Sequence, residues 1–341
     1  MAIKPSYNTE RTLLGEQLPL DTPYSVILDV SERCNFKCSY CFRAGKIDES
    51  WGFAAARSLM SPETFQRAAR QLAEFPRKIK VVSLSGHGEP LANPRIVDMV
   101  RYLKELNVAE QIDMHTNASL LTQENAPRIA RAGFTRIVVS LQGLDALSYE
   151  RTCGVKINFD KFYNNLKLLY ESKDSNLQIH IKIADVALGK ENVEESKQKF
   201  YALFSGIADH VYVEKVVPIW DNVDISTDGT TNKFGDATGG TNYCSLVFYK
   251  MMVDPDGEIY PCTKLPPPMS LGNISDTTLP EAWYGRTRSE FLKEHLCLTR
   301  HKHKPCVGCF IPVNSITSHK DVIDPYKDAI LERFKEISPD E

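Results

Sequence analysis

The chain has 341 residues, of which 42% are hydrophobic, enough to bury a sizeable core in one large barrel or in two domains. Its formal net charge of -3 provides no overall basic field for nucleic acid, and no apolar run approaches the length of a membrane span. Nine cysteines and no apolar signal segment near the N-terminus indicate a reducing cytoplasm and metal–sulfur chemistry rather than disulfides.

The first two thirds of the chain alternate between strand and helix patterns. Residues 1–23 read as an irregular N-terminal arm, and an apolar, β-branched run predicts a first strand over 24–30. Further strands are expected at 80–84, 111–115, 136–141, 177–183 and 210–217, and helices at 61–75, 94–106, 122–133, 159–172 and 191–204. This order predicts an α/β domain over 24–220 with parallel strands joined by right-handed crossovers. Six such units are fewer than the eight of a closed barrel.

The composition changes after residue 220. Residues 221–243 are rich in Gly, Thr, Asp and Asn, which predicts a linker or mobile loop. Residues 244–315 hold five cysteines among short strand patterns, and we expect a second, smaller domain there. The C-terminal segment, 316–341, contains an amphipathic helix pattern over 324–337 and carries no assigned chemistry.

A loop with three cysteines follows the first expected strand. Cys34, Cys38 and Cys41 have the spacing C-x3-C-x2-C. Three thiolates from one loop can hold a four-iron cube and leave one iron open, whereas electron-transfer clusters use four cysteines. A structural zinc knuckle and three buried free thiols are the alternatives for this loop.

This spacing, with the aromatic Tyr40 before the third cysteine, resembles the radical S-adenosylmethionine superfamily. The resemblance implies a partial (β/α)6 TIM-like barrel whose open iron binds the amino and carboxylate groups of S-adenosylmethionine. It also implies cleavage of that cofactor to a 5'-deoxyadenosyl radical, which removes a hydrogen atom from a substrate C–H bond. An external one-electron reductant, such as flavodoxin or ferredoxin, is the protein partner that this chemistry implies.

The loop after the second strand, Ser85 to Pro90, resembles the glycine-rich segment by which this family binds the ammonium of S-adenosylmethionine. The resemblance gives that role to Gly86, Gly88 and Glu89. His87 stands where relatives commonly have glycine. A plain turn containing Gly and Pro is the alternative.

Two further strand ends match the family pattern in part. His115-Thr-Asn117 is similar to the family's Thr-Asn-Gly, and Asn117 is a candidate contact for cofactor or substrate. Ser140-Leu-Gln-Gly143 is similar to Ser-Leu-Asp-Gly, which makes Ser140 a second candidate, while Gln142 replaces the acid. Ordinary turn chemistry at a strand end is the alternative for both.

The C-terminal cysteines form a second set. Cys244 precedes an expected hairpin at Asp256-Gly257, Cys262 follows it, and Cys306 and Cys309 form a C-x2-C pair. Four thiolates can complete a cluster with no open iron. This arrangement resembles the twitch form of the SPASM domain, which carries one auxiliary 4Fe-4S cluster. Zinc is the alternative, held by the same thiolates or with His295, His301 or His303.

Cys153 and Cys297 lie outside both sets. Either thiol could give a hydrogen atom to a substrate radical, and we treat both as candidate catalytic residues. A buried apolar role for Cys153 and a spare thiol or substitute ligand at Cys297 are the alternatives.

These features predict a radical S-adenosylmethionine enzyme that oxidises a carbinol of a sugar-like or aminocyclitol small molecule, as some twitch relatives do. An epimerase with a cysteine hydrogen donor is the next possibility. Modification of a ribosomally made peptide is a third, although only about 23 residues precede the first expected strand here. A metal-binding module without catalytic activity is the hypothesis from a different class. No nucleic-acid or membrane partner is expected.

Overall fold

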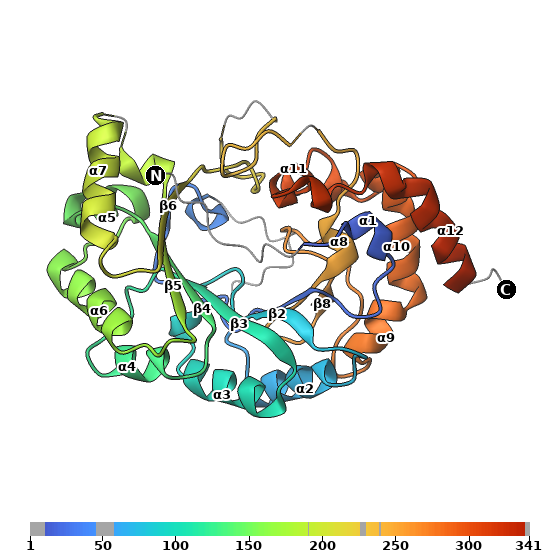
Figure 1. Cartoon of the computed structure of the whole chain (residues 1–341), viewed down its shortest axis with the longest axis horizontal. Coiled ribbons are helices and arrows are strands. Elements are labelled where there is room, and N and C mark those ends of the chain that lie inside the picture. Colours follow the sequence, from blue (N-terminus) through green and yellow to red (C-terminus); the bar gives the residue numbers. More distant parts are fainter. Residues whose placement is uncertain (1–10, 46–57, 190, 226–229, 239, 338–341) are drawn as a thin grey trace.

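The computed structural model describes residues 11–45, 58–189, 191–225, 230–238 and 240–337, and a curved eight-stranded sheet forms its centre (Figure 1). Its strands are β1 (Ser25–Leu28), β2 (Ile79–Ser83), β3 (Ala109–Thr116), β4 (Arg136–Leu141), β5 (Gln178–Ala184), β6 (His210–Glu214), β7 (Lys250–Val253) and β8 (Ile259–Tyr260). The order across the sheet is β6-β5-β4-β3-β2-β1-β7-β8, so the described sheet ends at β6 and β8 and does not close. Strands β1 to β6 pair in parallel, which confirms the predicted partial barrel.

Helices on the outer face of the sheet connect these strands (Figure 1). They are α2 (Pro62–Leu72), α3 (Ile96–Leu106), α4 (Asn125–Ala130), α5 (Ala146–Cys153), α6 (Phe159–Glu171) and α7 (Val193–Phe204). Helix α2 begins where the sequence predicts, because the Ser61 side chain accepts a hydrogen bond from the Thr64 N–H and Pro62 occupies the first turn. None of the helices in the described residues is long and apolar enough to cross a membrane.

The two faces of the sheet differ in chemistry. On β3, Ile112 and Met114 are buried against the helices, while Asp113 and His115 alternate with them and so face the barrel interior. Strands β4 and β5 repeat the pattern, with Ile137 and Ile179 at helix-facing positions of zero or near-zero exposure. The apolar core therefore lies between the sheet and the helices, and the barrel interior is polar.

The C-terminal region continues the same sheet. Strand β7 pairs in parallel with β1, Ser25 opposite Lys250, and β8 turns back antiparallel to β7 through Gly257, whose φ of +89° suits glycine. Four further helices follow the hairpin or flank it: α8 (Leu246–Tyr249), α9 (Leu279–Tyr284), α10 (Arg286–Leu296) and α11 (Ile311–Ser315). The hairpin of the predicted second domain is thus built into the barrel sheet.

Three segments differ from the sequence-based expectation. The arm contains a short helix, α1 (Leu14–Gln17), which lies beside the C-terminal helix α12 (Lys327–Ile337) (Figure 1). Helix α5 was not predicted. Within the expected linker, Asn232 is 1% exposed and donates a hydrogen bond to the carbonyl of Ile316 at 2.8 Å, so this part of 221–243 is packed.

Candidate active site

The cysteine loop leaves the carboxyl end of β1 and is held by α5. The N–H of Lys37 donates to the carbonyl of Cys153 at 3.2 Å, and the N–H of Ser39 donates to the carbonyl of Thr152 at 2.8 Å. The last carbonyl groups of a helix have no partner within the helix, and here two of them accept hydrogen bonds from the loop. Helix α5 is therefore the support that fixes the backbone between Cys34 and Cys41.

The three thiols of this loop are partly buried neighbours. Burial raises the pKa of Cys34, Cys38 and Cys41, and the nearby thiol of Cys41 raises that of Cys38 further. The N–H of Cys41 also donates to the carbonyl of Cys38 at 2.9 Å. Three thiols that disfavour one another's ionisation are suited to a cationic metal centre, which removes their protons on binding.

The glycine-rich segment after β2 packs directly on the cysteine loop. A Cβ atom on Gly88 would lie 2.2 Å from the carbonyl oxygen of Ser31, so only glycine permits this approach. The adjacent N–H of Glu89 donates to the carbonyl of Arg33 at 2.7 Å. At Gly86 a Cβ would collide with the Asp29 carboxylate. The two motifs that the sequence analysis singled out therefore share one backbone interface.

The carboxylate of Glu89 is buried at the junction of three loops. It accepts hydrogen bonds from the N–H of Leu91 at 3.0 Å, the N–H of Asn117 at 2.7 Å and the hydroxyl of Thr116. Burial raises its pKa to about 7, against the lowering effect of these donors. A carboxylate has about four acceptor sites, so three donors leave capacity for one further cationic donor. Its assignment to the cofactor ammonium stays a prediction.

The other predicted cofactor contacts surround the same loop. The Nδ2 of Asn117 lies 4.0 Å from the Sγ of Cys34 and 3.0 Å from the Oδ1 of Asn35. The Tyr40 hydroxyl donates to the side-chain carbonyl of Gln142, the residue that replaces the expected acid. The half-buried Ser140 uses its carbonyl to accept from the Nε2 of Gln142 at 2.9 Å. The sequence did not predict the contact between Gln142 and Tyr40, because it forms only when the end of β4 is folded against the cysteine loop.

His87 contacts one residue near each of the two predicted metal sites. Its ring Nδ1 lies 3.0 Å from the Oδ2 of Asp29, at the end of β1, and its Nε2 lies 3.1 Å from the carbonyl of Thr263, next to Cys262. Its own carbonyl accepts from the Nε of Arg43 at 2.8 Å. Both ring nitrogens therefore lie within hydrogen-bond distance of an oxygen atom. A signal was present in the sequence, since histidine interrupts a stretch that is usually glycine.

The four C-terminal cysteines converge from three segments. Cys244 precedes α8, Cys262 follows β8, and Cys306 and Cys309 occupy the loop after α10. Burial raises the pKa of Cys244 to about 12 and that of Cys306 to about 11, and neighbouring thiols of the set add to both. Burial likewise raises the pKa of Cys262 and Cys309.

The two thiol sets have the ligand numbers of iron–sulfur clusters, three cysteines in one set and four in the other. Within the described part of the chain, no three His, Cys, Asp or Glu side chains converge closely enough for one metal ion. A zinc ion would need its sulfurs about 2.3 Å from one point. A four-iron cube instead places its thiolates on separate corners. Cys34, Cys38 and Cys41 would hold one cube, and Cys244, Cys262, Cys306 and Cys309 would hold the other.

Of the histidines considered as alternative ligands, His295 is beside the second set. Its Nδ1 lies 2.9 Å from the Phe291 carbonyl, which requires a hydrogen on that nitrogen, and its Nε2 lies 4.0 Å from the Sγ of Cys306. His303 instead contacts Glu294 at 2.6 Å, and His301 is exposed. Only the first of these three is positioned to influence the thiol set.

The two remaining cysteines have different surroundings. Cys153 has no exposed area, donates its S–H to the Tyr149 carbonyl at 3.0 Å and lies behind the cysteine loop. Burial raises its pKa to about 11. Cys297 ends α10 and is exposed at the surface, near Lys327. Their assignment as hydrogen donors stays a prediction.

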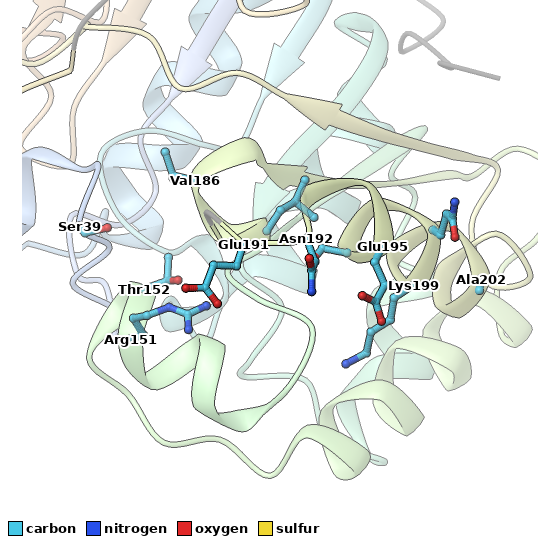
Figure 2. Close-up of a pocket in the computed structure, with 13 residues that line it drawn as sticks. Ser39, Arg151, Thr152, Val186, Glu191, Asn192, Glu195, Lys199 and Ala202 are labelled. Atoms are coloured by element: carbon cyan, nitrogen blue, oxygen red, sulfur yellow. The ribbon is translucent and has the colours of Figure 1, made fainter.

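A groove of about 1120 Å³ opens beside the cysteine loop, between α5 and α7. Figure 2 shows Ser39 and Thr152 at one end and Lys199 and Ala202 at the other. Its lining mixes charged side chains with the exposed Val186. Because Ser39 lines the groove, one end of it borders the cysteine loop.

Models of two protein families match this chain. The radical SAM superfamily model matches residues 28–197, and the model of SPASM, an iron-sulfur cluster-binding domain, matches residues 244–310. The chain belongs to the radical SAM superfamily. Its cofactors are S-adenosylmethionine and 4Fe-4S clusters, as the two domains together imply. The two matched regions contain the first and the second thiol set, respectively.

Curated relatives cover this chain to different extents. A tungsten-containing aldehyde ferredoxin oxidoreductase cofactor-modifying protein of Pyrococcus furiosus is 23% identical over 321 residues, 83% of this chain and 86% of the relative. A GTP 3',8-cyclase of Nostoc punctiforme is 32% identical over 128 residues, 37% of each chain. A PqqA peptide cyclase of Bradyrhizobium diazoefficiens is 28% identical over 134 residues, 39% of this chain and 32% of the relative. The chain thus spans about a third of the cyclases that it matches.

Solved structures share the fold at low sequence identity. SuiB of Streptococcus suis bound to S-adenosylmethionine has a TM-score of 0.60 at 17% identity, covering 92% of this chain and 79% of SuiB. Native anSMEcpe with bound AdoMet has a TM-score of 0.57 at 16% identity, covering 93% and 97%. BtrN in complex with AdoMet and 2-DOIA has a TM-score of 0.50 at 15% identity, covering 89% and 97%. These likenesses concern the fold alone.

Proposed function

We propose that this radical SAM enzyme oxidises a carbinol C–H of a sugar-like small molecule to a carbonyl. The substrate would lose one hydrogen atom from carbon, one proton from its hydroxyl and one further electron. When bound, the cofactors supply the 5'-deoxyadenosyl radical for the first loss and an electron-accepting auxiliary cluster for the last. The chain itself would position the substrate relative to both thiol sets and the cofactors that they hold.

The position of the two unassigned thiols is the observation that supports oxidation over epimerisation. An epimerase must return a hydrogen atom to the substrate radical. The S–H of Cys153 is sealed against the Tyr149 carbonyl, and Cys297 is at the protein surface. Cys153 lies within electrostatic reach of Cys34, but it has no exposed area through which to meet a substrate. The second electron is then the step that needs an acceptor, and the SPASM thiols provide a place for one.

The test is product analysis under anaerobic conditions. The protein, reconstituted with iron and sulfide, is incubated in heavy water with S-adenosylmethionine, dithionite and either a metabolite fraction or a peptide fraction of a cell extract. We expect deoxyadenosine together with a small molecule two mass units lighter than its precursor. A variant with Cys34, Cys38 and Cys41 replaced by alanine is the control, and it should form neither.

Other outcomes of the same incubation identify the alternatives. A small molecule of unchanged mass that gains one deuterium on carbon would establish epimerisation and overturn the proposal. A mass change only in the peptide fraction would establish a peptide substrate, as in the relatives named for peptide cyclisation or precursor binding. Replacing dithionite by reduced flavodoxin or ferredoxin tests the expected reductant separately.

A further inference from the structure

Asp113, Arg136, Lys182 and Glu214 of β3 to β6 are directed into the barrel. Glu110 of β3 instead shares the strand face of Ile112 and Met114. Strand pairing places Asp113 opposite Arg136, and Ser140 opposite Lys182. Alternate residues on these strands, such as Ile137 and Ile181, are fully buried against the helices. Because successive side chains of a strand point to opposite faces, the four charged residues named first share the interior face.

These interior groups carry more positive than negative charge. Glu214 forms ion pairs with both Lys182 and Lys233, and Asp113 forms one with Arg136. Lys250 of β7 lies within electrostatic reach of Asp113 and Lys233 but forms no ion pair or hydrogen bond in the described part of the chain. Four cations therefore accompany two carboxylates.

His115 adds no positive charge to this set. It lies deep in the barrel, where burial and the cations of Lys182, Lys233 and Arg136 lower its pKa to about 3. Its side chain nevertheless retains exposed area, so the space that it faces is open. Lys182 and Lys233 also keep 16% and 24% of their side-chain area exposed. A smaller cavity of about 220 Å³ lies at the amino ends of the strands, where Ser25, Gln111 and Arg136 line it.

The interior space borders residues near both thiol sets. His115 is two residues from Asn117, whose Nδ2 is 4.0 Å from the Sγ of Cys34. Lys250, in turn, lies within electrostatic reach of Cys262. A molecule in this interior space would therefore border residues near both predicted clusters.

We propose that the barrel interior binds an anionic group of the substrate, a phosphate or a carboxylate, and that Lys250 is its principal contact. Unpaired cations inside a protein are costly unless an anion meets them, and charge-assisted hydrogen bonds to phosphate or carboxylate are strong. This inference rests on the proposed function and narrows it to an acidic sugar-like substrate. It replaces the aminocyclitol expected from the sequence, because the same cations would repel an ammonium group.

The test measures anion binding without turnover. The reconstituted protein, saturated with S-adenosylmethionine so that the open iron is occupied, is titrated with inorganic phosphate, acetate or methylammonium at constant ionic strength, and unfolding is followed by calorimetry. We expect phosphate or acetate to raise the melting temperature in a saturable way and methylammonium to have no effect. The anion that acts at the lower concentration identifies the phosphate or carboxylate class.

Variants of Lys250 connect the effect to this site. Lys250→Met should weaken anion binding roughly tenfold or more, the expected effect of losing one hydrogen bond to a charged group. Lys250→Arg should retain binding, and Lys156→Met, at a lysine with 82% side-chain exposure, is the matched control. Absence of a saturable anion effect in the wild type, or an unchanged effect in a folded Lys250→Met variant, would overturn the inference. Because this titration measures binding and not turnover, its result does not depend on whether the proposed oxidation is observed.

Discussion

At the residue scale, the predicted role of Glu89 would link cofactor binding to pH. Its three donors come from two loops, and burial raises its pKa to about 7 from an ordinary value near 4.5. Because the folded state holds the proton more tightly, the stability from this group is lost as pH rises from about 4.5 to about 7. The ionised form that would bind an ammonium gains population over the upper part of the same range.

We therefore expect S-adenosylmethionine affinity to rise between pH 6 and 7.5 in the wild type and to be flat in Glu89→Gln. At pH 7.5 the variant should bind the cofactor about 1.5–3 kcal/mol more weakly, the value of a hydrogen bond to a charged group. Equilibrium dialysis with labelled cofactor measures both quantities. Equal affinity of the two proteins at pH 7.5 would remove Glu89 from the cofactor site.

His87 is the second residue whose role can be isolated. Its ring joins Asp29, which is buried, to the carbonyl of Thr263 in the second thiol region. His87→Ala should lower the free energy of unfolding by about 1–3 kcal/mol, because the buried Asp29 carboxylate and the Thr263 carbonyl each lose the ring as a hydrogen-bond partner. His301→Ala, at an exposed histidine, is the control and should change stability little. Chemical denaturation of both variants measures the difference, and equal stability would show that the bridge is dispensable.

At the element scale, α5 holds the cysteine loop through two backbone hydrogen bonds. The helix begins at a capping box, in which the Asp145 side chain accepts from the Ser148 N–H at 2.8 Å. Asp145→Ala should cost about 1 kcal/mol of stability, the usual value of an N-cap. It should also speed the loss of iron from the first thiol set, because that loop depends on the other end of the same helix.

The neighbouring helix α6 supplies a matched control. Its cap, Asn158, accepts from the Lys161 N–H at 3.0 Å, and the two backbone hydrogen bonds that hold the cysteine loop come from α5, not from α6. Asn158→Ala should therefore lower stability by a similar amount without faster iron loss. Iron release to a chelator at a temperature well below unfolding distinguishes the two variants. Equal release rates would show that α5 does not act through the loop.

Some elements could be predicted from the sequence and others could not. The strands that precede residue 220 were predictable because apolar β-branched runs with regular spacing are a local signal. Helix α5 was missed because its cap uses Asp145 with Ser148, and its surface is mostly polar. The interior charges were also missed. Lys182 and Glu214 alternate with apolar residues, as charged residues do in any strand that has one face exposed to solvent. Only the curvature of the sheet turns that face into an interior.

In the site too, residues close together in the sequence were predicted, and contacts between residues far apart in the sequence were not. Cys34, Cys38 and Cys41 lie in one loop, so their spacing alone predicted a shared centre. His87 contacts Thr263, 176 residues away, and Tyr40 contacts Gln142, 102 residues away. Such pairs follow from strand order and crossover geometry, which a single sequence does not reveal.

At the scale of the whole molecule, the two thiol sets predict iron content. Anaerobic reconstitution should give about eight irons per chain, four for each cubic cluster. Alanine at Cys34, Cys38 and Cys41 should remove about half of the iron and all cleavage of S-adenosylmethionine. Alanine at Cys306 and Cys309 should instead remove the other half and leave cofactor cleavage measurable. Iron and sulfide analysis with electron paramagnetic resonance checks this, and about four irons in the wild type, or stoichiometric zinc, would contradict it.

The sheet order makes a second prediction at this scale, because strands of the SPASM region extend the barrel sheet beyond β1. Strand β7 covers the edge of β1 through four residue pairs, from Ser25 to Leu28. Further along, the Nε1 of Trp283 donates to the carbonyl of Leu20 at 2.9 Å. A chain ending at residue 243 would expose that edge and the apolar surface beneath α9, and exposed edges promote aggregation.

We therefore expect residues 1–243 to be insoluble or to precipitate on reconstitution, although this span includes all six parallel strands of the predicted barrel. The full chain with alanine at Cys306 and Cys309 is the matched control, because it loses thiols of the second set while keeping the covering strand. It should remain soluble and fold cooperatively. Soluble yield and thermal unfolding compare the two proteins. A soluble 1–243 fragment that binds four irons and cleaves S-adenosylmethionine would show that the barrel is independent of β7, and that the SPASM region is an appended domain rather than part of the sheet.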